Sequence, residues 1–387
     1  MDKRWRFVCM LLIGICMLTG CWDRRELEER ASVLAIAVDV DEENEKNYRM
    51  TVQIPIPIKI AGSSSRSSQG GGSNTDAVKI MSVTGRTITD ATNNLQLRLN
   101  QRLFLGHTRV LAVSEEIARE GIEHIMDWFR REPQIRRLLW PIIVKGKAAS
   151  LLEIKPELAQ IPVVFIMDLI ENGKKMGIIP DKTLGDYFNA TSNKAMQPLL
   201  NYVEASRNEV KWKGIAIFRN HRMVGSLNPN HTWSLLQIRD KKRGGDVVVK
   251  LPGTEDDYVT FRPHFVDTNL EMRLHGARED GIEAIYHCEV QGDIVEITKQ
   301  GFHKGSPEKF IKDMEALIKR EMEERANQMI EKVQKQYNSD IFKLGLKLRG
   351  HHYRDYWIKH DWNQDFKNFP IRVEYTIKLR RLGMEMQ

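Results

Sequence analysis

Apolar residues in the first half of the chain alternate between strand-like runs and helix-like stripes. Stripes with apolar side chains three and four positions apart predict helices at residues 89–103, 117–129 and 148–154. Apolar or alternating runs predict strands at residues 33–38, 48–54, 78–83, 108–113 and 138–144. Because strands and helices alternate, we expect an N-terminal α/β domain over residues 21–190.

The last third of the chain carries its longest helical pattern. Apolar side chains recur at helical spacing from Phe310 to Tyr337, and Ser306 with Pro307 forms a typical helix start. We therefore expect one helix over residues 307–337. Runs that predict an antiparallel sheet flank this helix, at residues 259–265, 269–274, 282–290 and 371–379. Packing of the helix on the sheet predicts a C-terminal α+β domain over residues 247–387.

Between these two domains, residues 191–246 predict a small middle domain. A hairpin is expected from strands at residues 214–218 and 222–225, followed by a short helix at residues 232–238. In the N-terminal domain, residues 62–76 are almost all Ser, Gly, Asn and Gln, a composition that favours a flexible loop. The predicted fold class is α+β, with a three-domain mixed α/β body.

Residues 1–20 predict a lipoprotein signal peptide in front of this body. A basic start precedes the apolar run 7–18, which is too short to span a bilayer. The order Leu18-Thr19-Gly20-Cys21 resembles a lipobox. It predicts cleavage after Gly20, with a diacylglyceryl thioether and an N-acyl chain such as palmitate on Cys21. Such acyl chains would hold the protein on the outer face of a bacterial membrane. The alternative is an ordinary signal peptide that leaves Cys21 as a free thiol.

The net charge and the cysteine content restrict the surroundings and the partners that are expected for this protein. The net charge of +7 falls to +5 without residues 1–20, a modest excess that suits anionic lipid headgroups or wall polymers. This diffuse charge gives no argument for nucleic acid. Once the signal is removed, Cys288 is the one cysteine besides Cys21, so no intramolecular disulfide is expected. Cys288 lies in an alternating run and is interpreted as a small buried hydrophobe.

Motifs for catalysis are absent from the sequence. It contains no Walker A loop, dinucleotide-binding loop, nucleophilic serine elbow or HExxH zinc helix. The densest group of potential metal ligands is His351-His352 with His360-Asp361, and its neighbouring aromatic residues favour packed histidines over a metal site. The prediction is that the chain is not an enzyme and has no catalytic residue, metal or cofactor.

Several short motifs, in order along the chain, resemble one known family. They are Cys21 with Trp22-Asp23-Arg24-Arg25-Glu26-Leu27-Glu28, Gly106-His107-Thr108-Arg109-Val110-Leu111, Gly214 to Phe218 with Val224-Gly225-Ser226-Leu227, Ser339-Asp340-Ile341-Phe342 with Gly345, Tyr356-Trp357, Trp362, Phe366 and Pro370, and Arg380-Arg381-Leu382-Gly383. Their order and spacing resemble those of the Ger(x)C family of spore germination lipoproteins. The likeness covers essentially the whole mature chain.

The resemblance implies the C subunit of a GerA-type nutrient germinant receptor. Family members are similar three-domain α+β lipoproteins without known enzymatic activity. They lie on the outer face of the inner membrane of the spore, beside two integral membrane subunits, A and B. The implied role is a non-catalytic, membrane-anchored subunit needed for spore germination in response to nutrients. Whether this subunit binds a nutrient directly is left open by the resemblance.

Two other classes of protein compete with this interpretation. A solute-binding lipoprotein would deliver a ligand to a membrane transporter, and it predicts two similar α/β lobes around a cleft. A wall-modifying enzyme would require a catalytic constellation, which the sequence does not offer.

Overall fold

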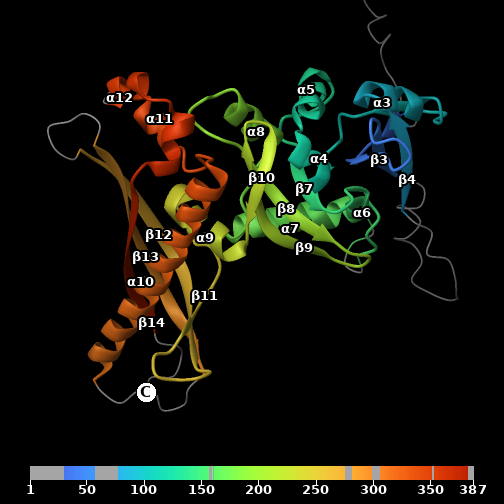
Figure 1. Cartoon of the computed structure of the whole chain (residues 1–387). Helices are drawn as coiled ribbons and strands as arrows, with labels where there is room; N and C mark the ends of the chain where they lie inside the picture. The colour runs from blue at the N-terminus through green and yellow to red at the C-terminus, as the bar shows by residue number, and fades with distance from the viewer. Residues whose placement is uncertain are drawn as a thin grey trace, which may run out of the picture.

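The computed structural model describes most of the chain from Arg30 onward. The described residues are 30–56, 77–156, 159, 161–274, 281–298, 306–350 and 353–381. The predicted signal peptide 1–20, the lipidation site Cys21 and the loop 62–76 fall outside them. Two sheets with their helices lie side by side as two arms of the molecule (Figure 1). Within the described ranges, no helix is both long enough and apolar enough to cross a lipid bilayer.

The described strands form three sheets. The largest has eight strands in the order β10-β9-β8-β7-β6-β2-β3-β4, a second has four in the order β11-β12-β13-β14, and β1 pairs with β5. Their bounds are β1 Arg30–Ser32, β2 Ala35–Val40, β3 Tyr48–Pro55, β4 Val78–Gly85, β5 Arg102–Phe104, β6 Val110–Ser114, β7 Trp140–Lys145, β8 Leu199–Ala205, β9 Val210–Arg219, β10 Arg222–Leu227, β11 Val247–Lys250, β12 Tyr258–Leu274, β13 Ile282–Ile297 and β14 Ile371–Arg381.

Helices lie in every region for which an apolar stripe predicts one, and short helices that no stripe predicts lie within residues 344–365. Their bounds are α3 Ile88–Gln96, α4 Glu115–Glu120, α5 Glu123–Arg131, α6 Ala149–Leu152, α7 Pro162–Lys175, α8 Leu184–Thr191, α9 Pro229–Asp240, α10 Pro307–Glu331, α11 Leu344–Leu348, α12 Arg354–Lys359 and α13 Trp362–Asp365, with a π-helical turn at Lys332–Tyr337 and a 3-10 turn at Phe366–Asn368. The α+β fold class predicted from the sequence is confirmed.

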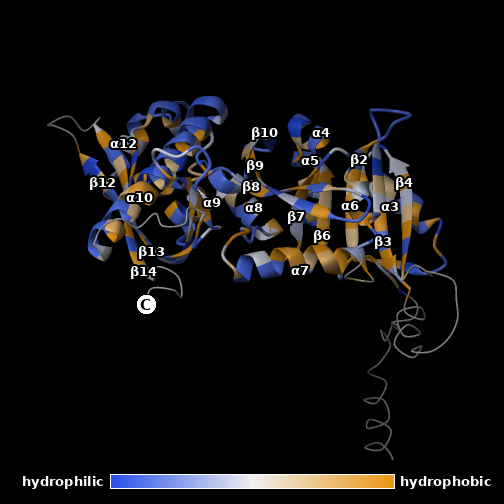
Figure 2. Cartoon of the chain, turned by 90° about the horizontal axis from the view of Figure 1, so that it is seen from below, coloured by the Kyte–Doolittle hydropathy of each residue, from blue (hydrophilic) through white to orange (hydrophobic). Residues whose placement is uncertain are grey.

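The middle of the large sheet is parallel and covered on both faces. Ala35 of β2 lies opposite Val110 of β6, which lies opposite Trp140 of β7. Helices α3, α4, α5 and α8 pack on one face, and α6 and α7 pack on the other. Figure 2 shows α7 and the pair α4–α5 on opposite sides of the strands. Burial on both faces explains why these strands read as continuous apolar runs.

A third core joins the end of the large sheet to the second sheet. It contains Leu199 of β8 and Ile215 of β9 together with Leu235 of α9 and Phe261 of β12. Strands β8 to β10 lie in the segment 191–246, and they continue the large sheet without a break. Helix α9, from the same segment, packs on α10. The division of the chain into three domains remains a prediction.

The C-terminal arm confirms the prediction of a sheet packed on one long helix. The Ser306 hydroxyl accepts the Lys309 N–H at the start of α10, and the helical path continues through the π-helical turn to Tyr337. Strands β11, β12 and β13 are antiparallel, but β14 runs parallel to β13, with Ile371 opposite Ala284. The expectation that β14 also pairs antiparallel is wrong, because the long helix returns the chain to the end where β13 begins.

Two helix boundaries in the first half differ from the predictions. The predicted helix 89–103 ends at Gln96, whose side-chain amide donates to Gln101 O at 3.0 Å and closes a loop. The stripe at 117–129 belongs to two helices, α4 and α5, because Gly121 between them has a φ of 130°. That backbone conformation interrupts an α-helix and favours glycine.

Candidate functional site

Residues 339–342 lie at the junction between the two arms. Asn338, with a φ of 46°, ends the long helix and turns the chain toward the large sheet. Ser339 then donates its hydroxyl to Phe218 O at 2.6 Å, and the Gln197 N–H donates to Asp340 O at 3.0 Å. The large sheet therefore holds the end of the long helix of the other arm.

The carboxylate of Asp340 is buried and accepts four N–H groups. Oδ1 accepts from the Phe342 N–H at 3.0 Å and the Leu344 N–H at 3.2 Å. Oδ2 accepts from the Gly345 N–H at 2.8 Å and from the Trp362 indole N–H at 3.0 Å. Burial raises the pKa of Asp340 to about 6, although these N–H groups lower it. The carboxylate is therefore ionised at neutral pH and organises the loop around it.

Close packing explains the glycine in this motif. A Cβ at Gly345 would overlap Ala195 O and the Trp362 indole. The same indole packs edge-on against Phe369, with ring centroids 5.1 Å apart. Gly345 and Trp362 thus belong to one buried unit with Asp340.

A second contact between the arms joins β10 to the end of the long helix. The Tyr337 hydroxyl donates to Ser226 O at 3.0 Å. A Cβ at Gly225 would overlap the Tyr337 ring, and the pairing of β10 with β9 shifts register between Met223 and Gly225. The missing side chain at Gly225 makes room for the aromatic ring.

A buried group of charges lies beside the junction. Arg239 pairs with Asp240, Nε to Oδ1, at 2.9 Å and donates to Ile341 O at 3.0 Å. Burial raises the pKa of Asp240, but the charge and hydrogen bonds of Arg239, together with the charges of Lys182 and Lys343, outweigh burial and lower the pKa to about 2. Burial, together with the Arg239 charge, lowers the pKa of Lys182 to about 8. The junction therefore contains the Arg239–Asp240 ion pair, with two further cations, Lys182 and Lys343, nearby.

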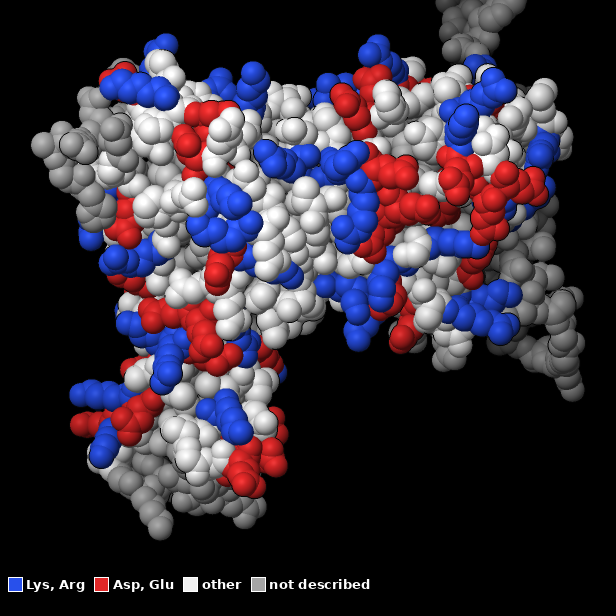
Figure 3. Space-filling view, viewed as in Figure 1, with Lys and Arg blue, Asp and Glu red and all other residues white. Residues whose placement is uncertain are grey.

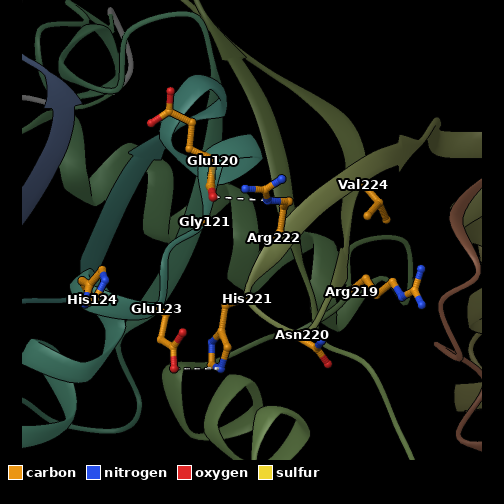
Figure 4. Close-up of a pocket in the computed structure, with 9 residues that line it drawn as sticks. All are labelled: Glu120, Gly121, Glu123, His124, Arg219, Asn220, His221, Arg222 and Val224. Atoms are coloured by element: carbon orange, nitrogen blue, oxygen red, sulfur yellow. Dashed lines mark hydrogen bonds and ion pairs between the residues drawn. The ribbon is translucent and has the colours of Figure 1, made fainter. Parts of the chain in front are cut away.

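An open pocket lies where the α4–α5 connection meets the β9–β10 turn (Figure 4). The turn is tight because Asn220 has a φ of 56°, and its N–H donates to Gln197 Oε1 at 2.6 Å. The pocket has a volume of about 540 Å³ and is lined by Glu120, Gly121, Glu123, His124, Arg219, Asn220, His221, Arg222 and Val224.

Hydrogen bonds fasten the two walls of the pocket to each other. The Ile122 N–H donates to His221 O at 2.9 Å, and Arg222 Nε donates to Glu120 O at 3.2 Å. His221 Nδ1 lies 2.8 Å from the hydroxyl of Tyr187, and burial raises the pKa of that hydroxyl far above its usual range. The lining carries charges of both signs, so it suits a small polar ligand. Within the lining, His221 Nε2 lies 3.9 Å from Glu123 Oε1 (Figure 4).

Several residues singled out in the sequence can be placed, and others cannot. Cys21, His351 and His352 lie outside the described residues. His360 Nδ1 contacts Asp365 Oδ2 at 3.1 Å, whereas Asp361 accepts the N–H of a residue in α13. Among the residues that the structure describes, no three His, Cys, Asp or Glu side chains form a metal-binding group.

The interpretation of Cys288 as a small buried hydrophobe is confirmed. Its side chain is buried in the core of the C-terminal arm, and burial raises the pKa of the thiol to about 11. A thiol with this pKa carries little thiolate at neutral pH and is a poor nucleophile.

Sequence reasoning missed the pocket. Its walls come from residues 120–124 and 219–224, which are far apart in the chain and carry no chemical motif. Gly121 and the turn at residues 219–222 can be recognised in the sequence, but no local pattern shows that these two segments meet.

Comparison with known protein families defines the class of protein to which the chain belongs. The family described as "Spore germination protein N-terminal domain" matches residues 23–205, and "Spore germination B3/ GerAC like, C-terminal" matches residues 213–383. The crystal structure of the GerBC protein has a TM-score of 0.57 with this chain, at 18% identity, and covers 89% of this chain and 96% of GerBC. At that identity the likeness shows a shared fold.

Several relatives that are named as spore germination proteins match most of the chain. Spore germination protein GerQC of Bacillus cereus is 25% identical over 316 residues, or 82% of this chain and 85% of the relative. YndF of Bacillus subtilis (strain 168) is 26% identical over 403 residues, or 97% and 95%. Spore germination protein KC of the same strain is 23% identical over 424 residues, or 99% and 97%. The chain belongs to the Ger(x)C family, the C-subunit family of spore germination receptors.

Proposed function

We propose that this chain is a non-catalytic, membrane-anchored lipoprotein subunit of a nutrient germinant receptor, needed for spores to germinate in response to nutrients. The observation that carries the proposal is the extent of the family match. The two matched regions run from residue 23 to residue 383, and the first begins two positions after Cys21. The predicted lipobox would therefore stand directly before the region that the family models match.

The proposed partners are the integral membrane A and B subunits and the membrane itself, on the outer face of the inner membrane of a spore-forming bacterium. A lipid anchor confines the body to a thin layer, which raises its effective concentration for partners in the same membrane. Contacts of modest affinity are then sufficient for assembly. Three B. subtilis relatives, the germination proteins KC, B3 and A3, support membership of such a receptor.

A role in assembly or signal coupling agrees with the chemistry of the described residues. The titratable groups at the junction are held by hydrogen bonds and ion pairs within the protein. The competing role of a solute-binding lipoprotein predicts two similar lobes. The eight-stranded and four-stranded sheets are dissimilar, which favours the receptor subunit.

The Cys21→Ala variant tests the proposal in spores. Without the acylated thiol, the protein should be lost from the inner-membrane fraction, and nutrient-triggered germination should be lost with it. Cys9→Ala is the matched control, because it changes a cysteine that leaves with the predicted signal peptide. If Cys21→Ala keeps both membrane retention and germination, the anchored role is wrong. Co-purification of the tagged wild-type chain should recover the A and B subunits.

A further inference from the structure

The first residue that the structure describes emerges at a particular edge of the large sheet. Strands β2, β6 and β7 are parallel and in register, so the segments leading into them meet at the same edge. Those segments are residues 30–34, 102–109 and 130–139. They are also linked directly, since Arg30 pairs with Arg102 in the small sheet and Leu105 N–H donates to Gln134 Oε1 at 2.9 Å.

This edge is rich in arginine. Arg130, Arg131, Arg136 and Arg137 stand in residues 130–139, where Glu132 is the one acidic residue. Helix α5, which carries Arg130 and Arg131, lies at the upper edge of the molecule in Figure 1, and Figure 3 shows basic side chains, with a few acidic ones, along that edge.

The most exposed part of the edge combines two free cations with an apolar side chain. The side chains of Arg136 and Arg137 are exposed, and neither guanidinium makes a hydrogen bond or ion pair with any residue that the structure describes. Leu138 directly follows them and is 67% exposed. An apolar side chain beside arginines is the composition that favours the headgroup boundary of an anionic membrane.

The length of the chain before Arg30 brings this edge near the membrane. Eight residues separate Cys21 from Arg30. Even fully extended, that connection reaches roughly 30 Å. With Cys21 anchored in the membrane, the edge at Arg30 is therefore held within roughly 30 Å of the lipid.

We propose that this edge, defined by Arg30, Arg102, Arg136, Arg137 and Leu138, docks on an anionic lipid bilayer and orients the receptor subunit. Leu138 enters the headgroup region, and the arginines bind lipid phosphates. The inference rests on the proposed lipid anchor at Cys21. It adds the orientation, in which the edge faces lipid and the four-stranded sheet stays away from it.

A fluorescent probe at position 138 tests the orientation. The full lipidated chain carrying Leu138→Cys is labelled with an environment-sensitive dye and reconstituted in vesicles of phosphatidylcholine with or without phosphatidylglycerol. Buried Cys288 does not compete for the label. The control probe is placed at Val248→Cys on β11, where the native side chain is 48% exposed. Nitroxide-labelled lipids should quench the probe at 138 and leave the probe at 248 bright.

Charge variants separate lipid docking from simple proximity. In the labelled chain, Arg136→Gln with Arg137→Gln should weaken docking on phosphatidylglycerol vesicles by about fivefold for each charge removed. Arg207→Gln with Lys211→Gln removes the same charge at the opposite edge of the sheet and should leave quenching unchanged. Equal quenching at 138 and 248 in retained protein overturns the orientation and leaves the anchor standing. Failure of the chain to stay on the vesicles overturns the proposed anchor as well.

Discussion

At the scale of single residues, Asp340 shows how one buried carboxylate links distant segments. Its two oxygens organise the loop from Phe342 to Gly345 and bind the Trp362 indole, while its main-chain oxygen accepts from Gln197. Removing the carboxylate leaves buried N–H groups without acceptors, and each such group costs about 1–3 kcal/mol. Asp340, Gly345 and Trp362, which are separated in the sequence, thus meet at this one carboxylate.

The raised pKa of Asp340 predicts a pH dependence of folding. The folded-state pKa of about 6 lies above the ordinary value of 3.8, so protonation favours the folded state. This stabilising contribution is complete below the ordinary pKa and is lost as the pH rises through about 6. It amounts to roughly 3 kcal/mol for a difference of about two pKa units.

Denaturant unfolding of wild type and Asp340→Asn measures this contribution. The free energy of unfolding of the wild type, relative to that of the variant, should fall by roughly 2.5 kcal/mol between about pH 4 and about pH 7. Asp361→Asn, at an exposed helix cap, is the control and should keep the wild-type pH profile. A pH-independent difference between wild type and Asp340→Asn contradicts the prediction.

At the scale of elements, Gly225 and Tyr337 show why β10 fits the long helix. Gly225→Ala should lower the free energy of unfolding by about 1–3 kcal/mol, because the added methyl group overlaps the tyrosine ring. Thermal and denaturant unfolding measure the loss. Gly185→Ala in α8 is the control, since its Cβ meets neighbours at ordinary contact distance. If both substitutions lower the free energy of unfolding equally, overlap with the Tyr337 ring is not the cause of the loss at Gly225.

Local patterns in the sequence predicted most of the elements and little of their arrangement. Apolar periodicity located α10, because a long helix with one buried face repeats its pattern many times. Apolar periodicity also predicted one helix over residues 117–129, although the chain breaks at Gly121. Helices α4 and α5 both face one core, so the apolar spacing does not show where one ends and the other begins. The parallel pairing of β14 depends on where the chain returns, which a local pattern does not encode.

In the candidate site, too, the sequence indicated the motif residues but not the distant segments that they contact. The motif residues Asp340, Gly345 and Trp362 were visible in the sequence, and the structure unites them through hydrogen bonds. Gln197, which donates to Asp340, and Phe218, which accepts from Ser339, were not predicted, because they contribute main-chain groups that any residue type supplies. The pocket was missed for the related reason that its two walls meet only in the folded chain.

At the scale of the whole molecule, α9 belongs energetically with the C-terminal arm. Leu235 and Ile238 of α9 lie in the same core as the four-stranded sheet. Gln237 accepts hydrogen bonds from two C-terminal side chains, Thr268 Oγ1 to its main-chain oxygen at 2.8 Å and the Tyr375 hydroxyl to Oε1 at 3.0 Å. A boundary at residue 247 would therefore cut through a packed core.

Two fragments test where the C-terminal arm begins. Both fragments lose Leu199, Ile215 and Ile217 from this core, but residues 228–387 retain α9 and should bind less of a hydrophobic dye than the shorter fragment. Residues 247–387 lack α9, so the apolar surface that Leu235 and Ile238 cover becomes exposed. Loss of two such side chains removes about 1.5–3 kcal/mol of burial for each. The shorter fragment should bind the dye strongly and unfold at lower denaturant. Equal midpoints and equal dye binding would instead place the boundary at residue 247 and make α9 part of the large-sheet arm.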